Sequence, residues 1–250
     1  TTPEEDEFNK DYDAVKQMEA LLAKRQAAVD YGGFEQPDPM PDAVPPVPKM
    51  NPLRAKQREI KERVMASTLQ EIADAEGTGD QGYNIVFGTP RGGSSSIFIN
   101  PTTELTNMTL KELDKFQRKL VNATRDEVKG VEPGHGTSAV GKYQVTMSTL
   151  ELATKKLGIK KKDWDKVKYS PELQEQIGRV LLEHRGLDKM LEGKITPEEY
   201  RIILNNEWAS IPGKKKKVGG QPTPANVGRI EGAFRKAINE LKVGSNSTVN

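Results

Sequence analysis

The feature that most constrains the fold is an apolar helical stripe that ends in a carboxylate. Residues recur at three- and four-residue spacing along one helical face, and the last of them is acidic: Met65, Leu69, Ile72, Ala73 and Glu76. Asp74 falls on the opposite face, and Gly77 follows as a cap. The pattern therefore predicts a helix over residues 53–76 whose buried face ends at Glu76.

This position gives Glu76 an unusual predicted acidity. Burial and the negative end of the helix dipole both disfavour the ionised carboxylate, so we expect its pKa to be raised. A carboxyl group that keeps its proton can act as a general acid. The same pattern also fits a Glu at the edge of a core face followed by a glycine cap, and Glu76 alone does not decide between them.

Three short motifs follow one another along the chain. The first joins Glu76-Gly77-Thr78 to Gly82-Tyr83-Asn84, the second is Gly141-Lys142-Tyr143-Gln144, and the third is Trp208-Ala209-Ser210-Ile211-Pro212-Gly213. In this order they resemble the endolysin of lambdoid phages and its relatives, lysozyme-like lytic transglycosylases that act on peptidoglycan. The resemblance covers residues 64–213, with an extension towards Leu241, and leaves the first 60 or so residues unaccounted for.

The resemblance implies an α+β, mainly α fold of the lysozyme type, with a small β lobe facing a helical body. It also implies that Glu76 protonates the glycosidic oxygen between MurNAc and GlcNAc and then acts as the base. The substrate itself closes a 1,6-anhydro ring. Asp80 is the candidate second carboxylate of a hydrolytic alternative.

The matched motifs also supply the expected substrate contacts, which are Thr78, Tyr83, Asn84, Lys142, Tyr143 and Gln144. For Tyr143 and Gln144 the alternatives of a core tyrosine and a satisfied amide stay open. Lys142 stands where relatives commonly have Arg, which keeps the charge but loses the bidentate fork. Trp208 is interpreted as a packing residue near the cleft.

Local signals predict a mainly helical body after Pro52 with one small extended region. Extended pieces are expected at residues 83–87 and 97–99, and a helix over residues 109–128. Capped helix starts are predicted at Thr109, Ser148, Ser170 and Thr196, and a helix stop at Gly158. The last helix carries an apolar stripe of Val227, Ile230, Phe234, Ile238 and Leu241.

Residues 1–51 differ in composition from residues 52–250, which form the expected catalytic domain. We expect an amphipathic helix over residues 8–29 and, because of the prolines between Pro37 and Pro48, an irregular arm after it. The first 50 residues carry five Lys or Arg against eleven Asp or Glu, so the rest of the chain holds +8 of a total charge of +2. We expect this acidic arm to bind other virion proteins.

Composition excludes several classes of protein. No apolar run approaches the ~20 residues that span a bilayer, and no secretory leader is visible. The chain has no cysteine, and its two histidines, His135 and His184, are far apart, so neither a metal nor a cofactor is expected. The basic charge is not interleaved with aromatic residues in a nucleic-acid-binding motif, and the lysine run at 214–217 fits a solvated loop.

These features together predict a phage lytic transglycosylase that is carried by the virion, in its tail or as an ejected protein. It would act in the bacterial periplasm and cell wall. Two alternatives stay open. One is a hydrolytic muramidase that acts as a free endolysin and accumulates in the host cytoplasm before lysis. The other is a structural virion protein that retains a lysozyme-like scaffold.

Overall fold

The computed structural model describes residues 52–79, 82–86, 103–124, 136–213 and 225–246. These parts of the chain are mainly helical. The helices are α2 (Pro52–Glu76), α3 (Leu110–Thr124), α4 (Met147–Lys156), α5 (Pro171–His184), α6 (Leu187–Leu191), α7 (Pro197–Leu204) and α8 (Val227–Asn246). Three short 3-10 turns complete them: η1 (Gly82–Asn84), η2 (Leu105–Asn107) and η3 (Lys161–Asp163).

Several sequence predictions concern residues outside these ranges. They are the arm at 1–51 with its helix, the extended piece at 97–99, the helix beyond residue 124, Asp80, His135 and the lysine run at 214–217. These remain predictions.

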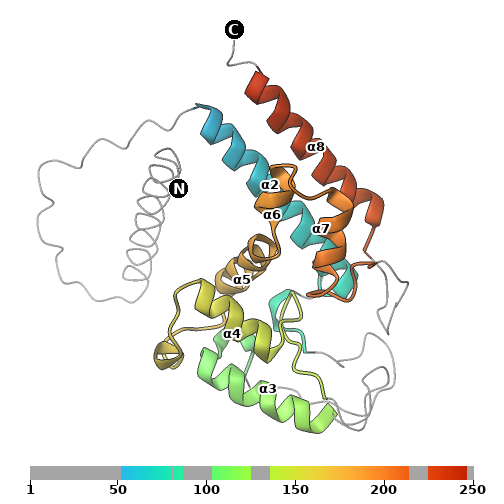
Figure 1. The fold of residues 1–250 in the computed structure, drawn as a ribbon. Coiled ribbons are helices and arrows are strands. Elements are labelled where there is room, and N and C mark those ends of the chain that lie inside the picture. Colours follow the sequence, from blue (N-terminus) through green and yellow to red (C-terminus); the bar gives the residue numbers. More distant parts are fainter. Residues whose placement is uncertain (1–51, 80–81, 87–102, 125–135, 214–224, 247–250) are drawn as a thin grey trace, which may run out of the picture. The chain divides into compact units, whose positions relative to one another are not determined.

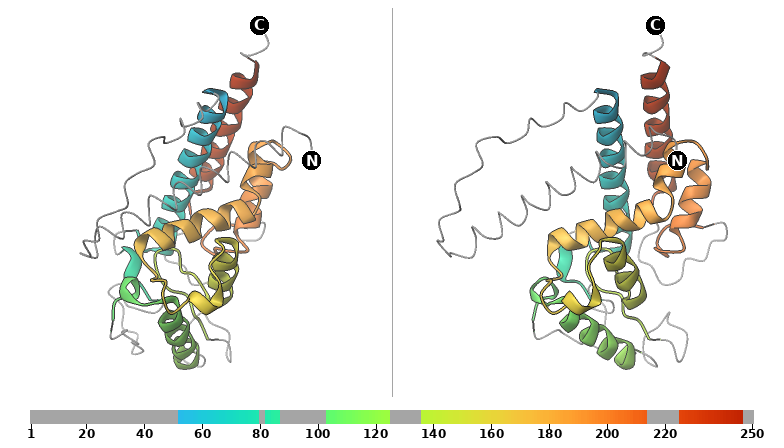
Figure 2. Two further views of the ribbon diagram at one scale, coloured as in Figure 1. Left: turned by 90° about the vertical axis from the view of Figure 1, so that its left-hand side faces the viewer. Right: turned by 60° about the vertical axis from the view of Figure 1, so that its left-hand side comes forward.

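Helices α2 and α8 lie side by side and run in opposite directions (Figures 1 and 2). Arg63 pairs with Glu240, and Arg229 pairs with Glu71 at 3.3 Å, so the order of the partners reverses from one helix to the other. Helices α6 and α7 pack on α8, and α5 packs on both α2 and α4. None of the described helices is both long and apolar enough to cross a bilayer.

The stripe of α2 is buried as predicted, and the observed helix begins one residue before the predicted one. Its apolar members are at most 3% exposed, whereas Asp74 is exposed. Gly77, with φ of 74°, ends the helix: its N–H donates to Asp74 O at 3.1 Å, and the N–H of Thr78 donates to Ala73 O at 2.8 Å. This pair of bonds is typical of a glycine-capped helix end and places Glu76 directly before the cap.

Three of the four predicted helix starts are confirmed, those at Thr109, Ser170 and Thr196. At Thr109 and Thr196 the hydroxyl accepts from the amide three residues later, and the Glu at that position bonds back to the capping amide. At Ser170 the hydroxyl accepts from the amide of Leu173 at 3.3 Å. These helix starts depend on residues only three positions apart, which is why the sequence predicts them.

The fourth predicted start, at Ser148, is wrong by two residues. Helix α4 is capped by Thr146, whose hydroxyl accepts from the amide of Thr149. Val145 pairs with Val140 directly before it, so the backbone is still extended at Thr146 and turns into the helix there. The predicted stop at Gly158 is confirmed, since α4 ends two residues earlier and Gly158 has φ of 74°.

Within the described residues no strand forms, and β structure consists of isolated antiparallel bridges. They join Val86 with Val140, Val140 with Val145, and Thr109 with Lys168. The extended piece predicted at 83–87 is wrong at its start, because residues 82–84 form the turn η1. Gly82 causes this turn: its φ is 72°, and its amide donates to Thr78 O at 2.8 Å.

Candidate active site

The second motif forms a tight turn that is held by a glutamine of α3 and a glutamine of α5. Residues 141–144 connect the bridged Val140 and Val145, and we call residues 138–145 the motif hairpin. Gln117 of α3 donates from Nε2 to Ser138 O at 2.7 Å and to Val145 O at 2.9 Å. Gln174 of α5 accepts from the backbone N–H of Lys142 at 3.0 Å. Both glutamines are fully buried, so these bonds form away from water.

The first and third motifs also contact the motif hairpin. The hydroxyl of Thr78, two residues after Glu76, donates to the backbone carbonyl of Lys142. Trp208 donates from Nε1 to the backbone carbonyl of Tyr143 at 3.0 Å and is buried, in agreement with the packing role predicted for it. Three segments separated by about 60 residues each therefore meet at the end of α2.

Glu76 lies partly buried at this meeting point. Burial raises the pKa of its carboxyl, as the sequence predicts, and the hydroxyl and backbone N–H of Ser210 oppose this rise as hydrogen-bond donors. The Ser210 hydroxyl makes no hydrogen bond of standard geometry within the described residues, so it lies close to the carboxyl without a fully formed bond. The first and third motifs thus meet at the carboxyl group itself.

A cluster of polar side chains joins the motif hairpin to α5 and centres on Glu175. The carboxylate accepts from Lys142 Nζ at 2.7 Å, from Tyr143 Oη at 2.8 Å and from Tyr83 Oη at 2.9 Å. The Lys142 ammonium also lies 5.0 Å from the ring centroid of Tyr83 and 5.4 Å from that of Tyr143. These contacts join η1, the motif hairpin and α5.

Ionisation in this cluster follows from its contacts. Burial disfavours the charged form of Glu175, but bonds from Lys142, Tyr143 and Tyr83 outweigh it and lower its pKa. Burial and the Glu175 carboxylate raise the pKa of Tyr143 and of Tyr83. Although burial acts in the other direction, the bond to Glu175 raises the pKa of Lys142. The cluster is therefore a stable ion pair with two neutral tyrosines.

The predicted substrate contacts divide into two groups in the structure. Thr78 and Tyr143 are 1% exposed, and the side chain of Lys142 is 16% exposed, so these residues mainly tie the motifs together. Asn84 is exposed and accepts from the backbone N–H of Thr106 at 2.9 Å. The burial of Tyr143 favours its interpretation as a core tyrosine. Direct contact with the sugar remains a prediction for all six residues.

Gln144 has a left-handed backbone conformation, with φ of 48°. This conformation is uncommon for a residue with a Cβ and stores strain. Its own side chain helps to hold it, because Nε2 donates to Gly141 O at 2.9 Å. Strained residues of this kind cluster at binding and catalytic sites, so Gln144 keeps its place among the candidate contacts.

The family comparison fits this convergence of motifs. The model of the family described as Endolysin matches residues 66–241, well over half of the chain, and the match includes all three motifs. The chain belongs to the endolysin family. It is therefore a phage enzyme that degrades peptidoglycan. No curated protein and no solved structure matches the chain at a significant level.

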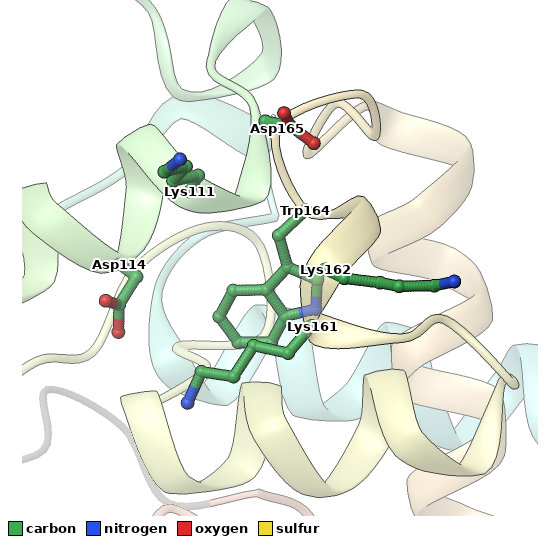
Figure 3. A pocket seen from close by; sticks show the side chains of 6 residues that line it. All are labelled: Lys111, Asp114, Lys161, Lys162, Trp164 and Asp165. Atoms are coloured by element: carbon green, nitrogen blue, oxygen red, sulfur yellow. The ribbon is translucent and has the colours of Figure 1, made fainter.

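A separate pocket contains none of the endolysin motif residues. Its lining comes from α3, η3 and the residues after η3: Lys111, Asp114, Lys161, Lys162, Trp164 and Asp165 (Figure 3). Lys161 Nζ lies 5.3 Å from the ring centroid of Trp164 and 3.2 Å from the carboxylate of Glu151. Within the described ranges no three His, Cys, Asp or Glu side chains gather as metal ligands would.

Sequence reasoning missed Gln117, Gln174 and Glu175. The two glutamines carry a readable signal, because each interrupts an otherwise apolar stripe, that of α3 and that of α5. A buried amide on a core face needs partners, and the carbonyls of a tight turn are such partners. Glu175 lies next to the stripe of α5 and carries no comparable signal.

Proposed function

We propose that the protein is a lytic transglycosylase that cleaves the β-1,4 bond between MurNAc and GlcNAc, with Glu76 as general acid and then general base. The supporting observation is that the three motifs meet at the end of α2, where the first and third bond to the motif hairpin and burial raises the pKa of the Glu76 carboxyl. A carboxyl group of this kind can hold a proton until the glycosidic oxygen is placed against it.

In the first step, the proton of Glu76 moves to the glycosidic oxygen as the bond from C1 of MurNAc to that oxygen breaks. The acetamido oxygen of the same sugar shares the positive charge that develops at C1. In the second step, the 6-hydroxyl oxygen attacks C1 while the Glu76 carboxylate takes the hydroxyl proton. The products are a 1,6-anhydro sugar and a free GlcNAc end, with no water consumed and Glu76 protonated again.

The carboxylates near the motifs support a mechanism without a second acid. Both oxygens of Glu175 accept hydrogen bonds from the polar cluster. Glu207 accepts from Thr149 at 2.8 Å and from Arg185 Nε at 3.0 Å, and its side chain is 5% exposed. Neither is free to act as a nucleophile on C1. Asp80 remains the candidate for a hydrolytic mechanism.

Product analysis tests the reaction type. Purified peptidoglycan is digested with the full chain, and the muropeptides are examined by mass spectrometry. We expect 1,6-anhydro-muramic acid ends, which are lighter by one water than reducing ends. Reducing ends as the main product would move the protein to the muramidases and would direct attention to Asp80, with Asp80→Asn as the variant to compare.

We further propose that the protein is carried by the virion and that the acidic, proline-rich residues 1–51 attach it there. A chain without residues 1–50 should keep its activity on purified cell wall. Phage particles assembled with this truncated chain should contain less of it than particles with the full chain. Equal incorporation of the two chains would contradict the role of residues 1–51 in attachment. Absence of the full chain from purified particles would favour a free endolysin instead.

A further inference from the structure

The loop that carries the third motif is held by its own backbone carbonyls. Three successive carbonyls each accept a hydrogen bond from a different donor: that of Ser210 from the Ala225 N–H at 2.9 Å, that of Ile211 from Asn205 Nδ2 at 2.6 Å, and that of Pro212 from Arg201 Nη1. The donors come from α7, the residue after it and the residues before α8. The loop is therefore fixed before any substrate binds.

The arginine of this arrangement is itself held in place. Arg201 donates from Nε to Glu231 of α8 at 2.8 Å, and the two side chains are 8% and 11% exposed. Glu231 also pairs with Arg235 one helical turn later, at 2.6 Å. Arg201 therefore has two partners, the Glu231 carboxylate and the Pro212 carbonyl, which lie on α8 and in the loop.

Ser210 has a hydroxyl that the fold alone does not account for. The residue is 2% exposed, and its hydroxyl has no hydrogen-bond partner of standard geometry within the described residues. A buried hydroxyl without a partner costs free energy. This hydroxyl and the backbone N–H of the same residue face the carboxyl of Glu76.

We propose that Ser210 is a positioning residue, which holds the carboxyl of Glu76 and stabilises the carboxylate that forms when Glu76 gives up its proton. The inference rests on the proposed function of Glu76. A donor interacts more strongly with a carboxylate than with a neutral carboxyl. The contact therefore strengthens as the proton moves to the glycosidic oxygen, and an interaction that is stronger in the transition state accelerates the reaction.

The surroundings of Glu76 make this role measurable. Within the described residues, burial raises the pKa of Glu76 and the two donors of Ser210 lower it, and no charged side chain contributes to the shift. The two Ser210 donors are thus the only described influence that favours the charged form. Removing the hydroxyl should raise the pKa of Glu76 further.

The test is the pH profile of kcat/KM for Ser210→Ala in the full chain. Because the acid must be protonated, the pKa of Glu76 sets the alkaline limb, and we expect this limb to move up by about one pH unit. We also expect kcat at the optimum to fall about tenfold. A merely structural role would lower the rate at every pH and leave the limb in place, which would overturn the proposal.

Thr154→Val is the matched control. The Thr154 hydroxyl is equally buried, but it bonds to Leu150 O within α4 at 2.8 Å. This variant should lose comparable stability without any shift of the alkaline limb. Ser210→Cys keeps the side-chain size with a weaker donor and should give an intermediate shift. If Ser210→Ala does not fold, the pH profile is measured with Ser210→Cys instead.

A direct titration separates this inference from the proposed function. The carboxyl carbon signal of Glu76 is followed by NMR against pH in the wild-type chain and in Ser210→Ala. It is assigned by its absence in Glu76→Gln. We expect a higher pKa in Ser210→Ala. Activity retained by Glu76→Gln would contradict the proposed function. An inactive Glu76→Gln with an unchanged titration in Ser210→Ala would contradict only the role of Ser210.

Discussion

Glu76 and Glu175 are two partly buried carboxyl groups near the converging motifs. Their pKa values are shifted in opposite directions. At Glu76, burial is opposed only by two donors from Ser210 within the described residues, so burial dominates and the pKa of Glu76 is raised. Glu175 meets a lysine and two tyrosine hydroxyls, and these lower its pKa although burial acts against them. The difference lies in the partners and not in the residue type.

This contrast assigns different roles to two identical side chains. A carboxyl group that resists ionisation can store a proton for catalysis, whereas one that is fixed as an anion can hold other groups in place. Glu175 fixes Lys142 and Tyr143 of the motif hairpin, and through Tyr83 it also fixes η1. The site thus combines a poorly solvated acid with a charged scaffold for the residues around it.

Glu76→Gln should have the largest effect on activity. The change keeps the shape and removes the proton donor, so we expect wall degradation to fall by at least about 10³-fold. Thermal stability at neutral pH should be unchanged or slightly higher, because a poorly solvated acid is removed. Turbidity loss of purified cell walls measures the activity. Asp74→Asn, an exposed carboxylate of the same helix, is the control and should be close to wild type.

Glu175→Gln should have a smaller effect on activity and a larger one on stability. Lys142 would lose its charged partner in a half-buried position, which we expect to cost about 1–2 kcal/mol of unfolding free energy. KM should rise by about an order of magnitude while kcat changes less, since the motif hairpin is displaced and the acid is kept. Chemical denaturation and initial rates measure the two effects.

Adding Lys142→Met to Glu175→Gln sharpens this prediction. If the ion pair is the stabilising element, the double variant should lose less stability than the sum of the two single variants. Additive losses would instead show that Glu175 acts mainly through the two tyrosine hydroxyls.

The pKa shifts of Glu175 and Glu76 also predict how the stability effects of Glu175→Gln and Glu76→Gln depend on pH. Glu175 has a lowered pKa when folded, so its contribution is present above about pH 4.5 and is lost as the pH falls through the folded pKa. Glu76 has a raised pKa when folded, so stability is lost as the pH rises from about 4.5 through that value. The cost of Glu175→Gln should therefore shrink in acid, and the gain from Glu76→Gln should vanish there.

Denaturation midpoints between pH 3.5 and 7.5 provide the measurement. A gain from Glu76→Gln that did not change over this range would mean that the Glu76 carboxyl is ordinarily solvated. That result would remove the contrast with Glu175.

Gln144→Gly should have the smallest effect. Glycine relieves the left-handed strain at this position but removes the bond from Nε2 to Gly141 O, so stability should change by less than about 1 kcal/mol. We expect KM to rise a few-fold if the side chain contacts the glycan. Binding of a soluble muropeptide to the glycine variant, measured by calorimetry, separates this from a purely conformational role, which would leave the affinity unchanged.

The parts of the fold that the sequence predicts depend on residues close together in the chain. The buried stripe of α2, the glycine cap after Glu76 and the helix starts at Thr109, Ser170 and Thr196 are all of this kind. The error at Ser148 arose because two hydroxyl residues compete within three positions, and only the bridged extended backbone before Thr146 decides between them. Such a decision needs a tertiary contact.

The candidate site was predictable only in part for the same reason. The three motifs identified Glu76, the motif hairpin and the 208–213 loop, but no pattern shows which side chains meet across them. Tyr83 and Glu175 are 92 positions apart, and Ser210 lies still further from Glu76. Partners at such distances leave no periodicity or spacing in one sequence, so Glu175 and the contact of Ser210 came only from the structure.

The antiparallel pairing of α2 with α8 has a consequence for when the enzyme becomes complete. Its ion pairs join residues 158 and 177 positions apart, so the helix that ends in Glu76 finds its neighbour only after nearly the whole matched region has been synthesised. Until α8 emerges from the ribosome, α2 lacks this neighbour, and contacts between such distant parts of a chain generally form late in folding. An unfinished chain therefore lacks the geometry that wall cleavage requires.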